Sequence, residues 1–133
     1  MYKDRNQLSI LNLTAKAIQL ALFATLNAGD HILVADSVYA PVRNLCKRVL
    51  PRFGIEPQFY DPNLGAEIES LFRPNTRVVY VESPGSQTFE LQDIPAIAAV
   101  THRHNALVIA DNAWATGYFF RSLAHGVDIC ALP

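Results

Sequence analysis

Short apolar runs alternate along the chain with longer stretches in which apolar residues recur at helical spacing. The apolar runs predict strands over residues 31–35, 56–60, 77–82, 106–110 and 127–132. The intervening stretches predict helices over residues 6–28, 41–50, 65–72, 94–102 and 122–126. Nearly continuous apolar strands that alternate with helices are typical of a parallel sheet. The predicted fold class is therefore α/β, a mostly parallel sheet with helices on both faces.

Turn-forming residues mark where the predicted helices begin and end. Gly29 follows the first helix and suits a left-handed C-cap. Pro41 fits the first turn of the second helix, and Asp93 opens the fourth. These boundaries support the alternation of helix and strand.

Four of the predicted strands end on an acidic residue, namely Asp36, Asp61, Glu82 and Asp111. Ligands bind outside the carboxyl ends of strands in open parallel sheets, so each acid is a candidate site residue. A carboxylate ahead of a helix also serves as an N-cap, the role that we expect for Asp36 and Asp61. A structural role is favoured for Glu82 as well. Asp111 follows the most apolar strand and the next basic residue is Arg121, so a cationic ligand is a candidate partner.

Composition narrows the classes of function. The 133 residues suffice for about one domain, half of them are hydrophobic and 17% are charged, so we expect a packed core. The formal net charge of −1 indicates no basic patch for nucleic acid. The longest apolar run is far short of the ~20 residues of a membrane span, and no signal peptide stands out. We expect a soluble, cytoplasmic protein without membrane or nucleic-acid partners.

Several common site motifs do not occur in the sequence. Neither the G-x-G-x-x-G fingerprint nor the G-x-x-x-x-G-K-[ST] loop is present, which excludes two familiar phosphate-binding turns. His102 and His104 are expected to form a solvated helix end rather than a metal site. Cys46 and Cys130 lie far apart without a C-x-x-C motif, and we expect two reduced, core-facing thiols.

Four stretches together resemble one enzyme family. They are AGDHILVADSVYAP at 28–41, YDPNLGAEIESLF at 60–72, VVYVESPGSQTFELQDIPAIA at 78–98 and VIADNAWATG at 108–117. The set resembles the Cys/Met-metabolism enzymes that use pyridoxal 5′-phosphate (PLP). Within that family, the ESPGS and FYDPNLGAEI segments resemble bacterial cystathionine β-lyase most. The resemblance covers residues 17–131 and implies part of the large PLP-binding domain of fold-type I, aspartate-aminotransferase-like enzymes.

The resemblance implies a role for five residues. Asp111 matches the aspartate that pairs with the pyridinium nitrogen of PLP and keeps the ring able to accept electrons. Tyr39 matches the tyrosine that stacks on that ring. Glu82 and Ser83 match the E-S-P segment beside the cofactor, where we expect structural roles. Trp114 follows the aspartate motif, and core packing is its expected role.

The sequence also departs from the family pattern. The family's Schiff-base lysine lies beyond the last strand predicted here, and none of the chain's lysines matches it: Lys3, Lys16 and Lys47. The family's phosphate-binding turn falls on Leu13-Thr14, where no glycine occurs, and Asn112-Ala113 replaces the family's Asn-Thr. We therefore expect residues 1–133 to form a partial PLP-binding domain, without the Schiff-base lysine region and the C-terminal domain.

The resemblance implies a carbon–sulfur lyase that converts cystathionine to homocysteine, pyruvate and ammonia by α,β-elimination. It also implies a small sulfur amino-acid substrate and a homotetramer. Because the covalent link and the phosphate cradle are missing, we expect weak PLP binding at best and no turnover from these 133 residues alone. Two alternatives stay open, a non-catalytic interaction module that reuses the half-sheet and a flavodoxin- or receiver-like domain.

Overall fold

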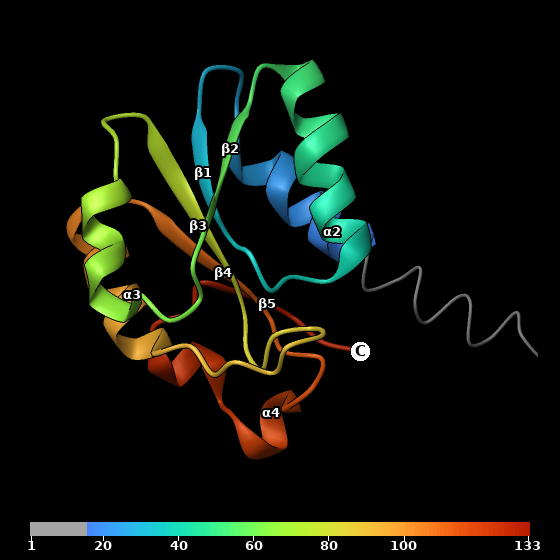
Figure 1. Ribbon diagram of the computed structural model, residues 1–133, viewed down its shortest axis with the longest axis vertical. Helices are drawn as coiled ribbons and strands as arrows, with labels where there is room; N and C mark the ends of the chain where they lie inside the picture. Colours follow the sequence, from blue (N-terminus) through green and yellow to red (C-terminus); the bar gives the residue numbers. More distant parts are fainter. Residues whose placement is uncertain (1–15) are drawn as a thin grey trace, which may run out of the picture.

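A parallel five-stranded sheet forms the centre of the molecule (Figure 1). The computed structural model describes residues 16–133. The strands are β1 His31–Ala35, β2 Glu56–Tyr60, β3 Thr76–Glu82, β4 Leu107–Asp111 and β5 Ile129–Ala131. They lie in the order β2-β1-β3-β4-β5, and each neighbouring pair is parallel. The predicted α/β class is confirmed.

Helices cover both faces of this sheet. One face carries the first helix, described from residue 16 to residue 25, and the continuous run of α2, η1 and η2 (Figure 1). That run comprises α2 Ala40–Asn44, the π-helix η1 Leu45–Val49 and the 3₁₀-helix η2 Leu50–Phe53. The other face carries η3 Gly65–Leu71 and α3 Ile94–Arg103, which pack together. In the described residues, no helix is long and apolar enough to cross a membrane.

The predicted elements agree with the observed ones except near their ends. The first helix ends at residue 25 rather than 28, and Gly29 adopts a φ of +91° in the turn that follows. Asp93 caps α3 by accepting a hydrogen bond from the Ala96 amide, as its position predicts. Two short helices follow β4, α4 Thr116–Phe119 and η4 Ser122–His125, and only the second was predicted.

The strand order brings the segments that follow β1, β3 and β4 to one edge of the sheet. The chain leaves β1 toward β2 on one side and then returns past β1 to β3 on the other, so the order in which strands are added reverses between β1 and β3. Loops diverge at such a switch point, and ligands bind in the crevice outside the carboxyl ends of these strands. The segments after β3 and β4 lie together at that edge, below the strands in Figure 1, and Phe89 contacts Trp114 between them.

Candidate functional site

Glu82 and Asp111 end neighbouring strands and are partners in the β3–β4 register. Paired residues of adjacent parallel strands project from the same face, so the two acids lie side by side. Both are buried, with 3% of Glu82 and 7% of Asp111 exposed. Glu82 also accepts a hydrogen bond from the Tyr39 amide at 2.8 Å. One carboxylate therefore links the segments that follow β1 and β3.

Burial dominates the ionisation of this pair. It raises the pKa of Asp111, while a 2.9 Å hydrogen bond from the Ala113 amide acts in the opposite direction. Burial likewise raises the pKa of Glu82; Ser86 and the Tyr39 amide lower it, and the Asp111 charge raises it. No ion pair within residues 16–133 includes either acid. Two desolvated acids without a cationic partner favour the binding of a positive group.

The other predicted site residues border this pair. Tyr39 precedes the first turn of α2, and its side chain is 39% exposed. Ser83 directly follows Glu82, and its hydroxyl accepts a hydrogen bond from the Gln92 amide at 2.9 Å. Ser83 therefore folds the loop after β3 back on itself, whereas the ring of Tyr39 is accessible.

Three expectations about side chains are wrong. Trp114 does not pack in the core: it is 59% exposed and meets Phe89 edge to face, with ring centroids 5.4 Å apart. Asp36 does not cap α2, because its carboxylate pairs with Arg43 at 2.6 Å. Asp61 does not cap η3 either; its carboxylate accepts hydrogen bonds from the backbone and side chain of Asn63 and forms a turn.

Sequence reasoning missed two polar side chains beside the acids. Tyr80 lies two residues before Glu82 on the same face of β3, is fully buried, and its hydroxyl has no partner among the described residues. Gln92 donates to the Glu82 carbonyl at 2.8 Å and accepts from the Tyr60 hydroxyl at 2.7 Å. The period of two along the strand could have identified Tyr80, whereas no local pattern marks Gln92.

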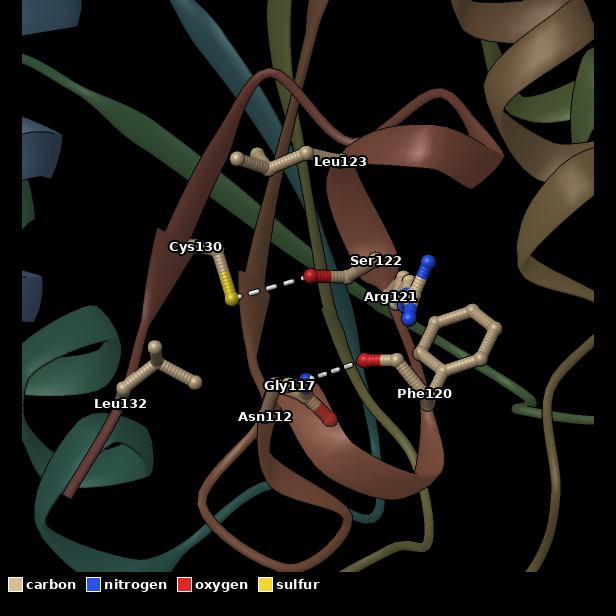
Figure 2. A pocket seen from close by; sticks show the side chains of 8 residues that line it. All are labelled: Asn112, Gly117, Phe120, Arg121, Ser122, Leu123, Cys130 and Leu132. Atoms are coloured by element: carbon tan, nitrogen blue, oxygen red, sulfur yellow. Dashed lines mark hydrogen bonds between the residues drawn. The ribbon is translucent and has the colours of Figure 1, made fainter.

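Asn112 holds the segment after Asp111 in place. Its side-chain amide donates to the carbonyls of Thr116 at 3.0 Å and Phe120 at 2.9 Å, and its backbone amide donates to Ala131 at 3.0 Å. Figure 2 shows the apolar cavity of about 220 Å³ beside it, where Ser122 also contacts Cys130. Cys130 of β5 lines this cavity, and none of the four predicted site residues does.

The basic and metal-ligating side chains lie elsewhere. Lys16 is exposed on the first helix, and the ammonium of Lys47 lies 5.4 Å from the ring of Phe59 on the outer strand β2. Neither lysine belongs to the β3–β4 edge. Lys3 and the predicted phosphate turn at Leu13-Thr14 lie outside the described residues. Within residues 16–133, no group of three potential metal ligands occurs, and both cysteines are free.

The histidines of α3 form a solvated helix end, as predicted. His102 contacts the carboxylate of Asp128 at 3.0 Å, and His104 contacts Glu69 at 3.2 Å. Both pairs are exposed and connect α3 to its neighbours, which gives the histidines a structural role.

Comparisons with known proteins identify the family of the chain. The model of the family described as "Cys/Met metabolism PLP-dependent enzyme" matches residues 8–132. A Rhizobium johnstonii protein named "Putative cystathionine beta-lyase" is 56% identical over 113 residues, which cover 85% of this chain and 28% of that protein. Cystathionine beta-lyase MetC of Escherichia coli is 37% identical over 117 residues, 86% of this chain and 30% of that enzyme.

Solved structures give the same assignment. The crystal structure of cystathionine gamma-lyase from Lactobacillus plantarum complexed with L-serine superposes with a TM-score of 0.83 at 34% identity, over 87% of this chain and 30% of that one. The chain thus spans about 30% of the length of these relatives. A family match across nearly all of the chain, on a sheet whose paired strand ends carry two buried acids, shows that the chain belongs to the PLP-dependent enzymes of Cys/Met metabolism.

Proposed function

We propose that this chain forms the ring-binding part of the PLP site of a carbon–sulfur lyase that acts on cystathionine-like thioether amino acids. The reaction proposed is α,β-elimination, which yields a thiol, pyruvate and ammonia. One observation carries the proposal: Asp111 is a buried carboxylate at the switch-point edge and has no cationic partner within residues 16–133.

The chemistry of the site fits PLP. When bound, PLP supplies a protonated pyridine ring that withdraws electrons from the substrate carbon. The carboxylate of Asp111 holds the proton on the ring nitrogen, because a buried anion stabilises the nearby positive charge. The half-exposed ring of Tyr39 offers an aromatic face for stacking. Glu82 accepts a hydrogen bond from the Tyr39 amide, so it fixes the position of Tyr39 relative to Asp111 on the neighbouring strand.

The same residues set the affinity that we expect. Stacking contributes about 0.5–1.5 kcal/mol beyond burial, and a partly exposed ion pair about 0–1 kcal/mol. Micromolar binding needs about −8 kcal/mol, and millimolar binding about −4 kcal/mol. Lys16 and Lys47 lie away from Asp111, so neither provides the covalent link. The two contributions together fall short of the free energy that millimolar binding needs, so we expect binding no tighter than millimolar, and no lyase turnover, from the 133-residue chain by itself.

A titration tests the proposal. The ligand is 4′-deoxypyridoxine 5′-phosphate, which lacks the aldehyde of PLP and cannot react with exposed lysines. Chemical shifts of the backbone amides after Glu82 and Asp111 are expected to move with a dissociation constant that is millimolar or weaker. Asp111→Asn should abolish these shifts, whereas Asp36→Asn, which alters an exposed strand-end acid, should leave them unchanged. Shifts that persist in Asp111→Asn would refute the proposed role of Asp111, and saturation at micromolar ligand would refute the affinity argument.

A second function is favoured by the surface near the same edge. Five large apolar side chains there are more than half exposed: Phe89, Leu91, Trp114, Tyr118 and Phe119. Apolar surface of this kind is common at protein–protein interfaces. We infer that the chain also assembles with other polypeptide chains, as a homo-oligomer or as a non-catalytic module. Light scattering at 1 to 100 µM tests this, and a monomer throughout that range would argue against it.

A further inference from the structure

Tyr80 is the most deeply buried phenol at the candidate site. It occupies the middle of β3, pairs in register with Val34 and Ile109, and is 0% exposed. Its hydroxyl has no hydrogen-bond partner within residues 16–133. A buried hydroxyl without a partner carries a desolvation penalty, so its retention calls for an explanation.

The surroundings of Tyr80 supply acceptors. The charges of Asp111 and then Glu82 are near enough to add to the effect of burial, which raises the pKa of Tyr80 well above its usual value. Cys46, from η1, adds the smallest contribution to the raised pKa of Tyr80, and burial raises the pKa of the Cys46 thiol itself to about 12, so this thiol is neutral. The phenol is thus a neutral donor beside two carboxylates.

The Asp111 carboxylate can accept more hydrogen bonds than the described residues donate to it. A carboxylate offers about four lone-pair positions, and within residues 16–133 only the Ala113 amide donates to Asp111. Glu82 receives the Tyr39 amide and contacts Ser86, so it is better satisfied. The Tyr80 hydroxyl, a donor without an acceptor, therefore lies near the Asp111 carboxylate, an acceptor with one donor among the described residues.

We propose that Tyr80 is a positioning residue for Asp111. Its phenol O–H donates a hydrogen bond to the Asp111 carboxylate, either directly after a small side-chain adjustment or through one buried water molecule. This bond favours the ionised form of Asp111 and holds it facing the edge of the sheet. The consequence for PLP rests on the proposed function, whereas the hydrogen bond itself does not.

Tyr60 provides a matched control. It is also a buried tyrosine on a strand of the same sheet, with 3% of its surface exposed. Its hydroxyl already donates to Gln92 at 2.7 Å, on the opposite face of the sheet from Asp111. Tyr60→Phe therefore removes a buried phenol hydroxyl that makes no hydrogen bond to either carboxylate, and its only link to the acids runs through Gln92 to the backbone carbonyl of Glu82.

The first experiment follows the ionisation of Asp111 in the 133-residue chain. Carboxyl ¹³C shifts are recorded against pH for wild type, Tyr80→Phe and Tyr60→Phe, with Asp111→Asn used to assign the signal. Losing a donor to the charged form should raise the midpoint of Asp111 in Tyr80→Phe and leave it unchanged in Tyr60→Phe. An unchanged or lower midpoint in Tyr80→Phe would overturn the proposal.

A double-mutant cycle gives an independent measure. A hydrogen bond to a charged group predicts that Tyr80→Phe lowers the folded-to-unfolded ratio roughly tenfold at neutral pH in wild type. The same change in the Asp111→Asn background should have a clearly smaller effect. If Tyr80→Phe instead stabilises the chain in both backgrounds, the hydroxyl is unpaired and the proposal fails.

Titration with 4′-deoxypyridoxine 5′-phosphate separates this proposal from the function. If the ligand does not bind wild type but Tyr80→Phe still shifts the Asp111 midpoint, the positioning role stands and the proposed function fails. If the ligand binds and the midpoint does not move, the function stands and the positioning role is refuted.

Discussion

Gly85 permits the close contact between the segment that follows β1 and the segment that follows β3. A Cβ added at Gly85 would lie 2.6 Å from Cβ and 2.7 Å from Oγ of Ser37. In the native structure, the Ser86 amide donates to the Ser37 carbonyl at 2.8 Å. We predict that Gly85→Ala separates these loops, because Cβ of Ser37 is fixed to the backbone and cannot rotate away.

The size of the effect follows from the distances. Carbon atoms pack best at about 3.5–4.0 Å, so the loops must separate by roughly 1 Å. Overpacking of this kind costs about 1–3 kcal/mol, and loss of the Ser86–Ser37 hydrogen bond adds about 0.5–1.5 kcal/mol. Gly85→Ala should therefore lower the free energy of unfolding by about 2–4 kcal/mol. With a urea slope of about 2 kcal/mol per molar, the middle of the usual range, the midpoint should fall by roughly 1–2 M.

Two further variants make the comparison specific. Gly117 has open space around it, so Gly117→Ala should change the free energy of unfolding by less than about 1 kcal/mol. Ser37→Gly removes the two closest of the three atoms that the new Cβ meets and leaves only Glu90 Oε2 at 3.2 Å, so it should restore more than half of the loss in the Gly85→Ala background. Urea unfolding followed by fluorescence of Trp114, the single tryptophan, measures all four chains. A Gly85→Ala midpoint equal to that of Gly117→Ala, or a failure of Ser37→Gly to restore it, would refute the steric reasoning.

The central strands of the sheet could be predicted because they are apolar on both faces. Residues 31–35 are all buried, and the continuous run HILVA shows this directly in the sequence. The adjacency of Glu82 and Asp111 follows from the same logic, since neighbouring parallel strands end at one edge. Asp36 was misassigned because its partner, Arg43, is brought to it by the turn geometry after β1. Trp114 was misassigned because hydrophobicity does not show which loop residues meet the core.

Three other predictions concern single groups. The pKa values of Asp111 and Glu82 are raised in the folded state, so the folded chain binds a proton at each carboxyl more tightly than the unfolded chain does. The free energy of unfolding should therefore fall as the pH rises from the ordinary pKa values, 3.8 and 4.5, through the raised pKa values of the folded state. Asp111→Asn should flatten that dependence in urea midpoints measured upward from the ordinary pKa of Asp111, 3.8, to neutral pH. A thiol reagent at pH 8 should modify Cys130 and leave Cys46, whose pKa is about 12, intact until unfolding, as mass spectrometry would show. Asp93→Ala removes the α3 cap and should cost about 1 kcal/mol in unfolding free energy.

Strand order by itself does not assign a cofactor, and the paired acids supply what the strand order leaves open. The order β2-β1-β3-β4-β5 is also that of flavodoxin-like sheets, so the topology specifies where a ligand binds but not its chemistry. In our proposal Glu82 and Asp111 supply the chemistry, because each is desolvated and the charge of Asp111 raises the pKa of Glu82. A purely structural position would tolerate a neutral amide without that penalty. A positive group bound at this edge would remove the penalty, so ligand binding and stability should be coupled through Asp111. Added ligand should then stabilise wild type more than Asp111→Asn.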